Sequence, residues 1–448
     1  MKKSSALILL FLAGVIFTAP CAFACVPSDT TVTLETSPVG FASVNALGQN
    51  GTTGGAGGDT IYVTSGDALY TFLDDRKDPN GTLHLPPKIV VIQGKITSTK
   101  KQLEIKQTYN LTFIGKGTDA SFEGTGLFVK QSYNIIIRNL EFRNSPIDGI
   151  AIQYAESHHV WIDHCTLSDS PDLDTADARH DGLIDITHCA SYVTVSWCHL
   201  TNHTKTCLLG HDDGNSAEDA GKLKTTYHHN WFDNSGQRHP RVRYAECHIY
   251  NNYYVGNGRM LYGVASTCTA QVTVEGNYFK GVPSPTLVGY AESPVGNLVE
   301  RNNIYVNSGT PQTLGTVPEP GASYQYTLTD PALLPVIIPK YCGSGKMPVV
   351  TGTSGKGKFV PEQFGLAQNF PNPFNPVTVI SYYIPVARKV TLRVFDVLGK
   401  EAALLIDKEE SVGRHEVSFN AVSLPSGVYY YSLKAGEFLQ TRKMLLLK

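Results

Sequence analysis

Short apolar segments with the same internal order recur through the middle of this chain. Each begins with strand-forming, often β-branched residues, continues with a polar residue that is often Asn, and ends on an aromatic residue or leucine. The clearest examples are Ile135–Phe142, Val160–Leu167, Val193–Leu200, Thr226–Phe232, His248–Tyr254, Val272–Phe279 and Val299–Tyr305. We interpret each segment as a β-strand, a polar turn position and a second apolar contact.

The Asn positions of these segments recur at a nearly constant interval. Asn230 and Asn252 are 22 residues apart, and the steps from Asn252 to Asn277 and from Asn277 to Asn302 are each 25 residues. A repeat of this length without a helix matches one coil of a right-handed parallel β-helix. The predicted fold is therefore all-β, with the Asn side chains in a hydrogen-bonded ladder and the aromatic residues and leucines stacked inside.

Wider intervals occur earlier in the repeat. Cys165 and Cys198 are 33 residues apart, and Cys198 and Asn230 are 32 residues apart. These coils have room for loops, which hold the acidic segments 169–181 and 210–221. A β-propeller or a sandwich is the alternative, but either would need shorter intervals and more Asn-Gly or Asp-Gly turns.

The N-terminus is typical of a secretory signal peptide over residues 1–24. Lys2 and Lys3 precede an apolar run over residues 6–17, and Ala22-Phe-Ala24 matches a cleavage site. The run is too short for a stable membrane span. The formal net charge of the 448-residue chain is only −2. We expect an exported protein, secreted or attached to the cell surface, that acts as a monomer and has no nucleic-acid partner.

Composition divides the mature chain into three parts. The repeats predict a β-helix domain over residues 25–342, and a segment rich in Gly, Ser, Lys and Pro predicts a linker over 343–365. Short alternating strands over 366–448 predict a small Ig-like β-sandwich. Of nine cysteines, Cys21 leaves with the signal, and both disulfides and buried free thiols are compatible with the other eight.

The C-terminal part also carries recognisable motifs. They are Phe370–Pro376 (FPNPFNP), Val394–Gly399, Leu424–Tyr429 and Lys443–Lys448. Together they resemble the C-terminal sorting domain of type IX secretion cargo. The resemblance implies that the type IX secretion machinery is a partner and that the protein crosses the outer membrane. An accessory sandwich that binds sugar is the alternative.

The segment Gly236–Arg243 places three arginines within six residues of an otherwise balanced chain. The planar guanidinium matches a carboxylate, so the cluster predicts a clamp for an anionic ligand, with a solvated basic loop as the alternative. In an extended segment Arg241 and Arg243 share a face, whereas Arg238 shares a face with Pro240.

Three aspartates stand near the predicted loops. Asp181 and Asp185 share a face if their segment is extended, and Asp148 precedes the strand one coil earlier. Oxygen ligands on loops suit a hard cation, and calcium accepts irregular geometry more readily than magnesium does. Solvated acidic loops are the alternative to this predicted calcium site.

Histidines stand in pairs at His158-His159 and His228-His229. Adjacent side chains on a strand face opposite ways, and neither pair has the spacing of a zinc motif. We therefore predict structural roles for both pairs.

Taken together, the motifs resemble the pectate lyase family of secreted parallel β-helix polysaccharide lyases. The similarity runs from about Val39 to Val306. Its anchors are Gly40–Ser43, Thr52–Gly55, Val160–His164, Asp181–Asp185, Asn202–Thr206, Leu209–Asp213 and Gly236–Arg243. The resemblance implies calcium-dependent β-elimination of polygalacturonate, (1→4)-α-D-galacturonan, to 4,5-unsaturated oligogalacturonides.

The resemblance also implies a role for each matching residue. Asp148, Asp181 and Asp185 match calcium ligands, Arg238 matches the catalytic base, and Lys205 and Arg243 match contacts to the substrate carboxylate. Asp163 matches a structural signature residue, and Arg241 is expected to support the cluster.

The chemistry accounts for these residue types. Elimination removes the C5 proton beside the C6 carboxylate and expels the O4 oxygen, so positive groups that bind the carboxylate stabilise the developing anion. A guanidinium is normally protonated, and a base role requires neighbouring cations that disfavour the protonated form.

Three other functions fit the same fold. A pectin lyase acting on methylated pectin would not need the three aspartates, and a glycoside hydrolase would need paired carboxylates and no arginine base. A surface protein that binds pectin without cleaving it would not need Lys205, Arg238 and Arg243 together.

Overall fold

The computed structural model describes residues 35–79, 84–170 and 180–347, and residues 364–448 except 367, 368, 370, 371, 385, 412 and 437. The predicted signal peptide and Cys25 lie outside the described residues. Two bodies are present, a parallel β-helix and a C-terminal β-sandwich, and each has its own hydrophobic core. No helix among the described residues is long and apolar enough to cross a membrane.

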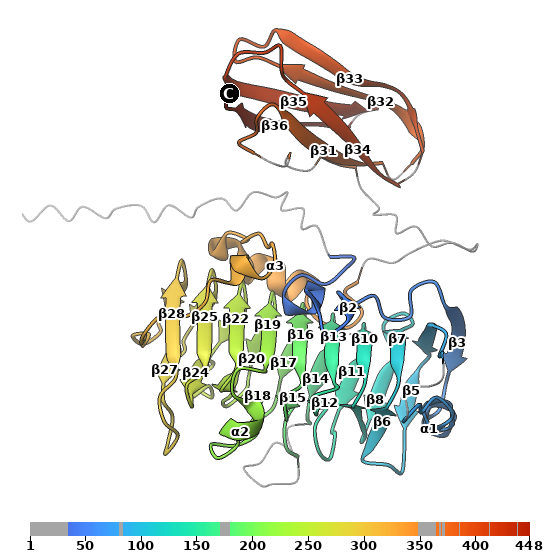
Figure 1. The fold of residues 1–448 in the computed structure, drawn as a ribbon, viewed down its shortest axis with the longest axis vertical. Coiled ribbons are helices and arrows are strands. Elements are labelled where there is room, and N and C mark those ends of the chain that lie inside the picture. The colour runs from blue at the N-terminus through green and yellow to red at the C-terminus, as the bar shows by residue number, and fades with distance from the viewer. Residues whose placement is uncertain are drawn as a thin grey trace, which may run out of the picture. The chain divides into compact units, whose positions relative to one another are not determined.

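The β-helix consists of three parallel sheets that run along its axis (Figure 1). The ten-stranded sheet contains β3 (Asp59–Val63), β4 (Lys88–Ile92), β7 (Tyr109–Gly115), β10 (Tyr133–Arg138), β13 (His158–Asp163), β16 (Ser191–Ser196), β19 (Lys224–His228), β22 (Glu246–Tyr250), β25 (Gln271–Glu275) and β28 (Asn297–Arg301). The nine-stranded sheet contains β5 (Lys95–Thr97), β8 (Ser121–Glu123), β11 (Glu141–Arg143), β14 (Thr166–Ser168), β17 (His199–Thr201), β20 (Trp231–Asp233), β23 (Tyr253–Val255), β26 (Tyr278–Lys280) and β29 (Ile304–Val306). The eight-stranded sheet contains β6 (Gln102–Lys106), β9 (Gly126–Lys130), β12 (Ile150–Gln153), β15 (Ile184–Thr187), β18 (Cys207–Leu209), β21 (Arg241–Arg243), β24 (Val264–Thr267) and β27 (Thr286–Val288). The predicted parallel β-helix is confirmed.

Short elements complete this body. They are the 3-10 helices η1 (Phe41–Ser43), η2 (Pro320–Ala322) and η3 (Pro331–Leu333), the hairpin strands β1 (Asn45–Ala46) and β2 (Gln49–Asn50), and the helices α1 (Gly66–Asp75), α2 (Ser216–Asp219) and α3 (Leu334–Tyr341). Helix α1 lies at the N-terminal end of the β-helix (Figure 1). Its residues Leu69 and Leu73 are buried in the core beside the first coils.

One column of side chains fills the interior along the nine-stranded sheet. In register order it contains Phe122, Phe142, Leu167, Leu200, Phe232, Tyr254, Phe279 and Tyr305. The rings of Tyr254 and Phe279 stack with their centroids 4.3 Å apart, and those of Phe232 and Tyr254 are 5.0 Å apart. The prediction that aromatic residues and leucines stack inside is confirmed, because equivalent residues of successive coils meet at the spacing of paired strands.

The Asn ladder is also present, with one position corrected. The Asn252 amide N–H donates to Asn277 Oδ1 at 2.8 Å, and the Asn277 N–H donates to Asn303 Oδ1 at 2.8 Å. The sequence predicted Asn302 at this step, but Asn302 has a left-handed backbone (φ 56°) and forms the turn before the ladder position. Cys198 continues the ladder toward the N-terminus, since its N–H donates to Asn230 Oδ1 at 2.9 Å.

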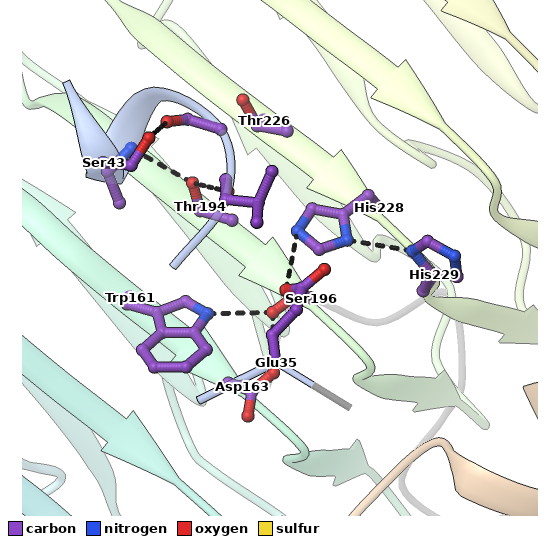
Figure 2. Close-up of polar contacts among 12 residues, drawn as sticks. Glu35, Ser43, Trp161, Asp163, Thr194, Ser196, Thr226, His228 and His229 are labelled. Atoms are coloured by element: carbon purple, nitrogen blue, oxygen red, sulfur yellow. Dashed lines mark hydrogen bonds and ion pairs between the residues drawn. The ribbon is translucent and has the colours of Figure 1, made fainter. Parts of the chain in front are cut away.

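An N-terminal strap over residues 35–55 covers the outer face of the ten-stranded sheet, and Figure 2 shows part of this contact. The N–H groups of Phe41 and Ala42 donate to the hydroxyl oxygens of Thr226 and Thr194, at 3.0 and 3.1 Å. Side chains of the sheet thus accept hydrogen bonds from the backbone N–H groups of the strap, which has few strand partners of its own.

Asp163 lies beneath this strap and has a structural environment. Its carboxylate accepts hydrogen bonds from Arg138, His164 and Ser196 at 2.6–2.8 Å, and Ser196 in turn accepts from Trp161 Nε1. The side chain is fully buried. These charged and neutral donors lower the pKa of Asp163 although burial opposes them.

The histidine pairs are structural in their contacts, but the expected opposite orientation is wrong. The Nδ1 atoms of His158 and His159 are 2.8 Å apart, and those of His228 and His229 are 3.0 Å apart. His159 and His229 have left-handed backbones (φ 54° each), so side-chain alternation does not hold at these positions. Burial lowers the pKa of His228 to about 3, so the ring is neutral at physiological pH.

All seven cysteines in the described part of the chain are buried and unpaired: Cys165, Cys189, Cys198, Cys207, Cys247, Cys268 and Cys342. Of the two alternatives left open by the sequence, the structure therefore has free thiols at these positions.

The first residues of the predicted linker bind to the β-helix. The N–H groups of Gly343 and Gly345 donate to Trp197 O and Asn139 Oδ1, each at 2.7 Å. Residues 348–363 of this segment lie outside the described residues.

The C-terminal body consists of two antiparallel sheets around one core. One sheet contains β30 (Gly365–Leu366), β31 (Val377–Ile384) and β34 (Gly413–Asn420), and the other contains β33 (Glu401–Glu410), β32 (Arg388–Phe395), β35 (Gly427–Ala435) and β36 (Phe438–Leu446). Alternating residues such as Val390, Leu392 and Val394 point into the core. The predicted small β-sandwich is confirmed.

The ladder makes a prediction about stability. Asn252 is fully buried; its Oδ1 accepts from the Asn230 N–H of the preceding coil, and its side-chain amide donates to Tyr227 O and Tyr250 O. Asn252→Ala leaves these groups without partners, so we expect a loss of about 2–4 kcal/mol in the free energy of unfolding, measured by urea denaturation. Lys280→Ala, a change at an exposed position of β26 on the next coil, should cost less than about 0.5 kcal/mol. Equal losses for the two variants would contradict the role of the ladder.

Candidate active site

The predicted site residues lie at one edge of the eight-stranded sheet, on four successive coils. Asp148 precedes β12, Asp185 lies in β15, Lys205 precedes β18, and Arg238 precedes β21. Parallel pairing aligns these strands, with Ala151 opposite Asp185, Asp185 opposite Leu208 and Leu208 opposite Arg241. Residues 23 to 34 positions apart in sequence are therefore neighbours because they occupy equivalent places on adjacent coils.

Asp148 and Asp185 form a buried carboxylate pair around Gly182. The Gly182 N–H donates to Asp148 Oδ1 at 3.0 Å, and the Leu208 N–H donates to Asp185 Oδ1 at 3.1 Å. A Cβ atom on Gly182 would lie 2.5 Å from Asp185 Oδ1 and 3.1 Å from Asp148 Oδ1. Glycine is therefore required here for space between two carboxylates that are only 5–6 % exposed.

Burial changes the ionisation of both groups. Burial raises the pKa of Asp185 to about 6, against the opposing effect of Arg238, and the like charge of Asp181 adds to the increase. The pKa of Asp148 is also raised well above its usual value, by burial and by the like charges of Asp185 and Asp181. A cation bound between these oxygens would relieve the repulsion.

Asp181 is placed differently from the other two carboxylates. Its side chain is 56 % exposed, and its Oδ1 accepts a hydrogen bond from Lys205 Nζ at 3.1 Å. Among the described residues, Asp181 is not part of a group of three potential metal ligands whose atoms all lie within 4.8 Å of one another. Such a group is formed by Glu35, His228 and His229, where the strap meets the ten-stranded sheet. The structure thus brings Asp148 and Asp185 together and turns Asp181 toward Lys205.

Arg238 has no carboxylate within ion-pair distance in the described part of the chain. Its backbone is left-handed (φ 66°), and its carbonyl accepts the Cys207 N–H at 2.7 Å. Nε is buried without a hydrogen-bond partner, although the guanidinium is close enough to lower the pKa of Asp148 and Asp185. Arg238 thus precedes β21 in a left-handed conformation, with its guanidinium near the carboxylate pair.

His239 supports this turn. The buried ring contacts Ser235 Oγ and Tyr262 O, each at 2.8 Å, and burial lowers the pKa of His239 to about 4. Because both ring nitrogens have partners, the neutral ring of His239 connects the segment at Ser235 to the backbone of Tyr262.

Arg241 and Arg243 share the outer face of β21, as the sequence predicted, because Val242 between them is fully buried. The Arg243 Nε donates to Asp213 Oδ1 at 2.6 Å, and Nη1 faces the carbonyls of Gly210 and His211.

Arg241 has a supporting environment. Its guanidinium lies over the Tyr290 ring at 5.3 Å from the centroid and donates to Ser293 Oγ. Burial and the positive charge of Arg243 lower the pKa of Arg241.

Asp213 is a residue of the site that sequence reasoning missed. Burial alone would raise its pKa, but hydrogen bonds from Ser293 and Arg243 lower the pKa of Asp213 to about 2. It lies in the acidic segment 210–221 and ends the motif Leu209–Asp213, but neither signal indicated that it pairs with Arg243.

The buried carboxylates suit a hard cation. Asp148 and Asp185 offer only oxygen atoms, flank a position that a Cβ atom would fill, and have no ion pair within 4.0 Å among the described residues. Calcium binds such irregular oxygen sites, so the Asp148–Asp185 pair fits this ion.

A parallel β-helix with a carboxylate pair beside an arginine cluster fits a polysaccharide lyase of the pectate type, the class that the comparisons with known proteins identify. The family model described as pectate lyase matches residues 6–333, and the model of the secretion system C-terminal sorting domain matches residues 368–447. The chain belongs to the pectate lyase family and carries a type IX sorting domain, so it is secreted or attached to the cell surface.

Similar proteins agree with this assignment. A pectate trisaccharide-lyase of Bacillus licheniformis is 33 % identical over 361 residues, which cover 78 % of this chain and 99 % of that protein. A probable pectate lyase A of Aspergillus flavus is 40 % identical over 248 residues, covering 54 % of this chain and 71 % of that protein. The crystal structure of a pectate lyase from a Bacillus species in complex with trigalacturonate is 30 % identical, with a TM-score of 0.62 over 69 % of this chain and 99 % of that chain.

The raised pKa of Asp185 predicts how stability depends on pH without calcium. The folded-state value of about 6 exceeds the ordinary 3.8, so the folded protein holds a proton that the unfolded chain releases. This stabilisation is complete below about pH 4 and is lost as the pH rises through about 6, a change of about 3 kcal/mol. Urea denaturation in a chelator across this range should show the loss.

Asp185→Asn should remove the contribution of Asp185 and so reduce this pH dependence, and the exposed Asp212→Asn should keep it in full. An unchanged pH profile in Asp185→Asn would show that another group causes the loss.

Proposed function

We propose that this protein cleaves polygalacturonate by calcium-dependent β-elimination and releases 4,5-unsaturated oligogalacturonides. The observation that carries the proposal is the Arg238 guanidinium, without a carboxylate partner among the described residues, beside the buried Asp148–Asp185 pair. Membership of the pectate lyase family and the similarity to an enzyme solved with trigalacturonate support the same substrate.

Asp148 and Asp185 would hold the calcium ion, together with Asp181. When bound, calcium would withdraw negative charge from the C6 carboxylate of the substrate. Ionising the two buried aspartates requires loss of their protons, so metal binding competes with protonation at low pH.

Lys205 and Arg243 are the contacts proposed for the substrate carboxylate. The Lys205 side chain is 29 % exposed and pairs with the exposed Asp181, so its ammonium group can exchange this partner for a substrate carboxylate. Arg243 is held by Asp213 through Nε, which leaves Nη2 for the substrate. A bound carboxylate would thus meet two positive groups from adjacent coils.

Arg238 is the proposed base. Its neutral guanidine takes the C5 proton, the electron pair of the C5–H bond forms the C4=C5 double bond, and the C4–O4 bond breaks. The leaving O4 takes a proton from water, so the reaction needs no further reactant. Arg238 differs from Arg243 in having no carboxylate within ion-pair distance among the described residues, so its guanidine is available to the substrate.

The sorting domain and the site also support proposals about export and oligomeric state. The sorting domain over residues 368–447 supports the type IX secretion machinery as a partner. All proposed site residues come from coils of one chain, which supports action as a monomer.

Removing the base should stop turnover. We expect Arg238→Lys to lower kcat by about 100-fold or more, because an ammonium group cannot reach the C5 proton in the same geometry. The ultraviolet absorbance of unsaturated products measures the rate, and calorimetric binding of trigalacturonate should stay within about threefold of wild type. A fully active variant would remove Arg238 from the base role.

Removing calcium should also stop turnover. We expect a chelator to abolish activity on polygalacturonate and added calcium to restore it, because substrate and site are both acidic. Asp148→Asn should need about tenfold or more calcium for half-maximal activity, while Asp212→Asn should match wild type. Turnover that survives the chelator would contradict the calcium assignment and favour a pectin lyase.

A further inference from the structure

Lys205 and Asp181 both lie on loops, yet their side chains meet at 3.1 Å. Backbone hydrogen bonds between coils hold the main chain here: Lys205 forms a parallel bridge with Gln237, and the Asp181 N–H donates to Ile147 O at 3.3 Å. A side-chain contact that supports both loops would add to this placement, because a flexible lysine alone gains little from an exposed ion pair.

A buried carboxylate on the nine-stranded side makes that contact. Asp169 directly follows β14, and its side chain is only 3 % exposed. Its Oδ2 accepts from His180 Nδ1 at 2.8 Å and lies 3.3 Å from His203 Nε2. His180 precedes Asp181 in the chain, and His203 lies two residues before Lys205.

The second ring nitrogen of His203 extends the connection to Lys205. The Lys205 backbone N–H donates to His203 Nδ1 at 3.0 Å, so Nδ1 is unprotonated and Nε2 carries the proton. Nε2–H therefore points at Asp169, which selects this tautomer. Asp169 thus contacts His203, which binds the backbone of Lys205, and it also contacts His180, which directly precedes Asp181.

We propose that Asp169 is a positioning residue that holds Lys205 and Asp181 side by side through His203 and His180. The inference rests on the proposed function, because it assigns Asp169 to the placement of the substrate contact Lys205. Asp169 does not itself touch substrate or metal. Hydrogen-bonded partners of this kind keep reacting groups in place, and their loss commonly costs tenfold to 100-fold in activity.

The test uses the full-length protein and the variants Asp169→Asn and Lys205→Gln, alone and combined. In the wild-type background Asp169→Asn should lower kcat/KM on polygalacturonate by about tenfold or more. In the Lys205→Gln background the loss should be severalfold smaller than in wild type, because one of the two residues that Asp169 positions is gone and only the placement of Asp181 is still affected. Calorimetric binding of trigalacturonate should show the same coupling without turnover.

A matched control comes from the same sheet. Asp233 and His199 form a similar pair, with His199 Nε2 2.9 Å from Asp233 Oδ1, but the pair has no link to Lys205. Asp233→Asn should leave kcat/KM within about twofold of wild type. His203→Gln removes the acceptor for the Lys205 N–H and gives a second test if Asp169→Asn does not fold.

The outcomes separate the two proposals. Equal rates for wild type and Lys205→Gln would overturn the substrate role of Lys205 and this inference with it. A loss in Lys205→Gln with an unchanged rate in Asp169→Asn, or equal effects of Asp169→Asn in both backgrounds, would overturn the positioning role alone.

Discussion

The hydrogen bonds between successive coils are the interaction on which the rest of this structure depends. They pair each strand with the strand one coil later, so a residue on one coil lies beside its counterpart on the next. This register stacks the rings of Phe232, Tyr254 and Phe279 inside and aligns the amides of the Asn ladder. It also assembles the proposed active site, since Asp148, Asp185 and Arg238 belong to different coils.

The charged side chains of the site differ in whether they have an oppositely charged partner. Asp148 and Asp185 are buried around Gly182, and this burial raises their pKa values. Arg243 has a carboxylate partner in Asp213, whereas Arg238 has none among the described residues. Three arginines of one short segment thus differ in chemistry because the fold supplies each with different neighbours.

Local sequence patterns predicted much of this arrangement. The strand–Asn–aromatic order and its interval were sufficient for the β-helix, and alternation was sufficient to place Arg241 and Arg243 on one face around Val242. The same rule failed at His159 and His229, and the ladder was assigned to Asn302 instead of Asn303. In each failure a residue adopts a left-handed turn, which interrupts the alternation that the prediction assumed.

The sequence by itself determined the coils, the sandwich and the types of residue available for the chemistry, because these depend on local periodicity and on motifs that are contiguous. Only the tertiary structure decided which charged groups meet. Asp213 binds Arg243 from 30 residues away, and Asp169 links His180 and His203 across two loops. Such contacts depend on how loops of different length fold back on the sheet edge, and no local pattern of hydrophobic and polar residues encodes that geometry.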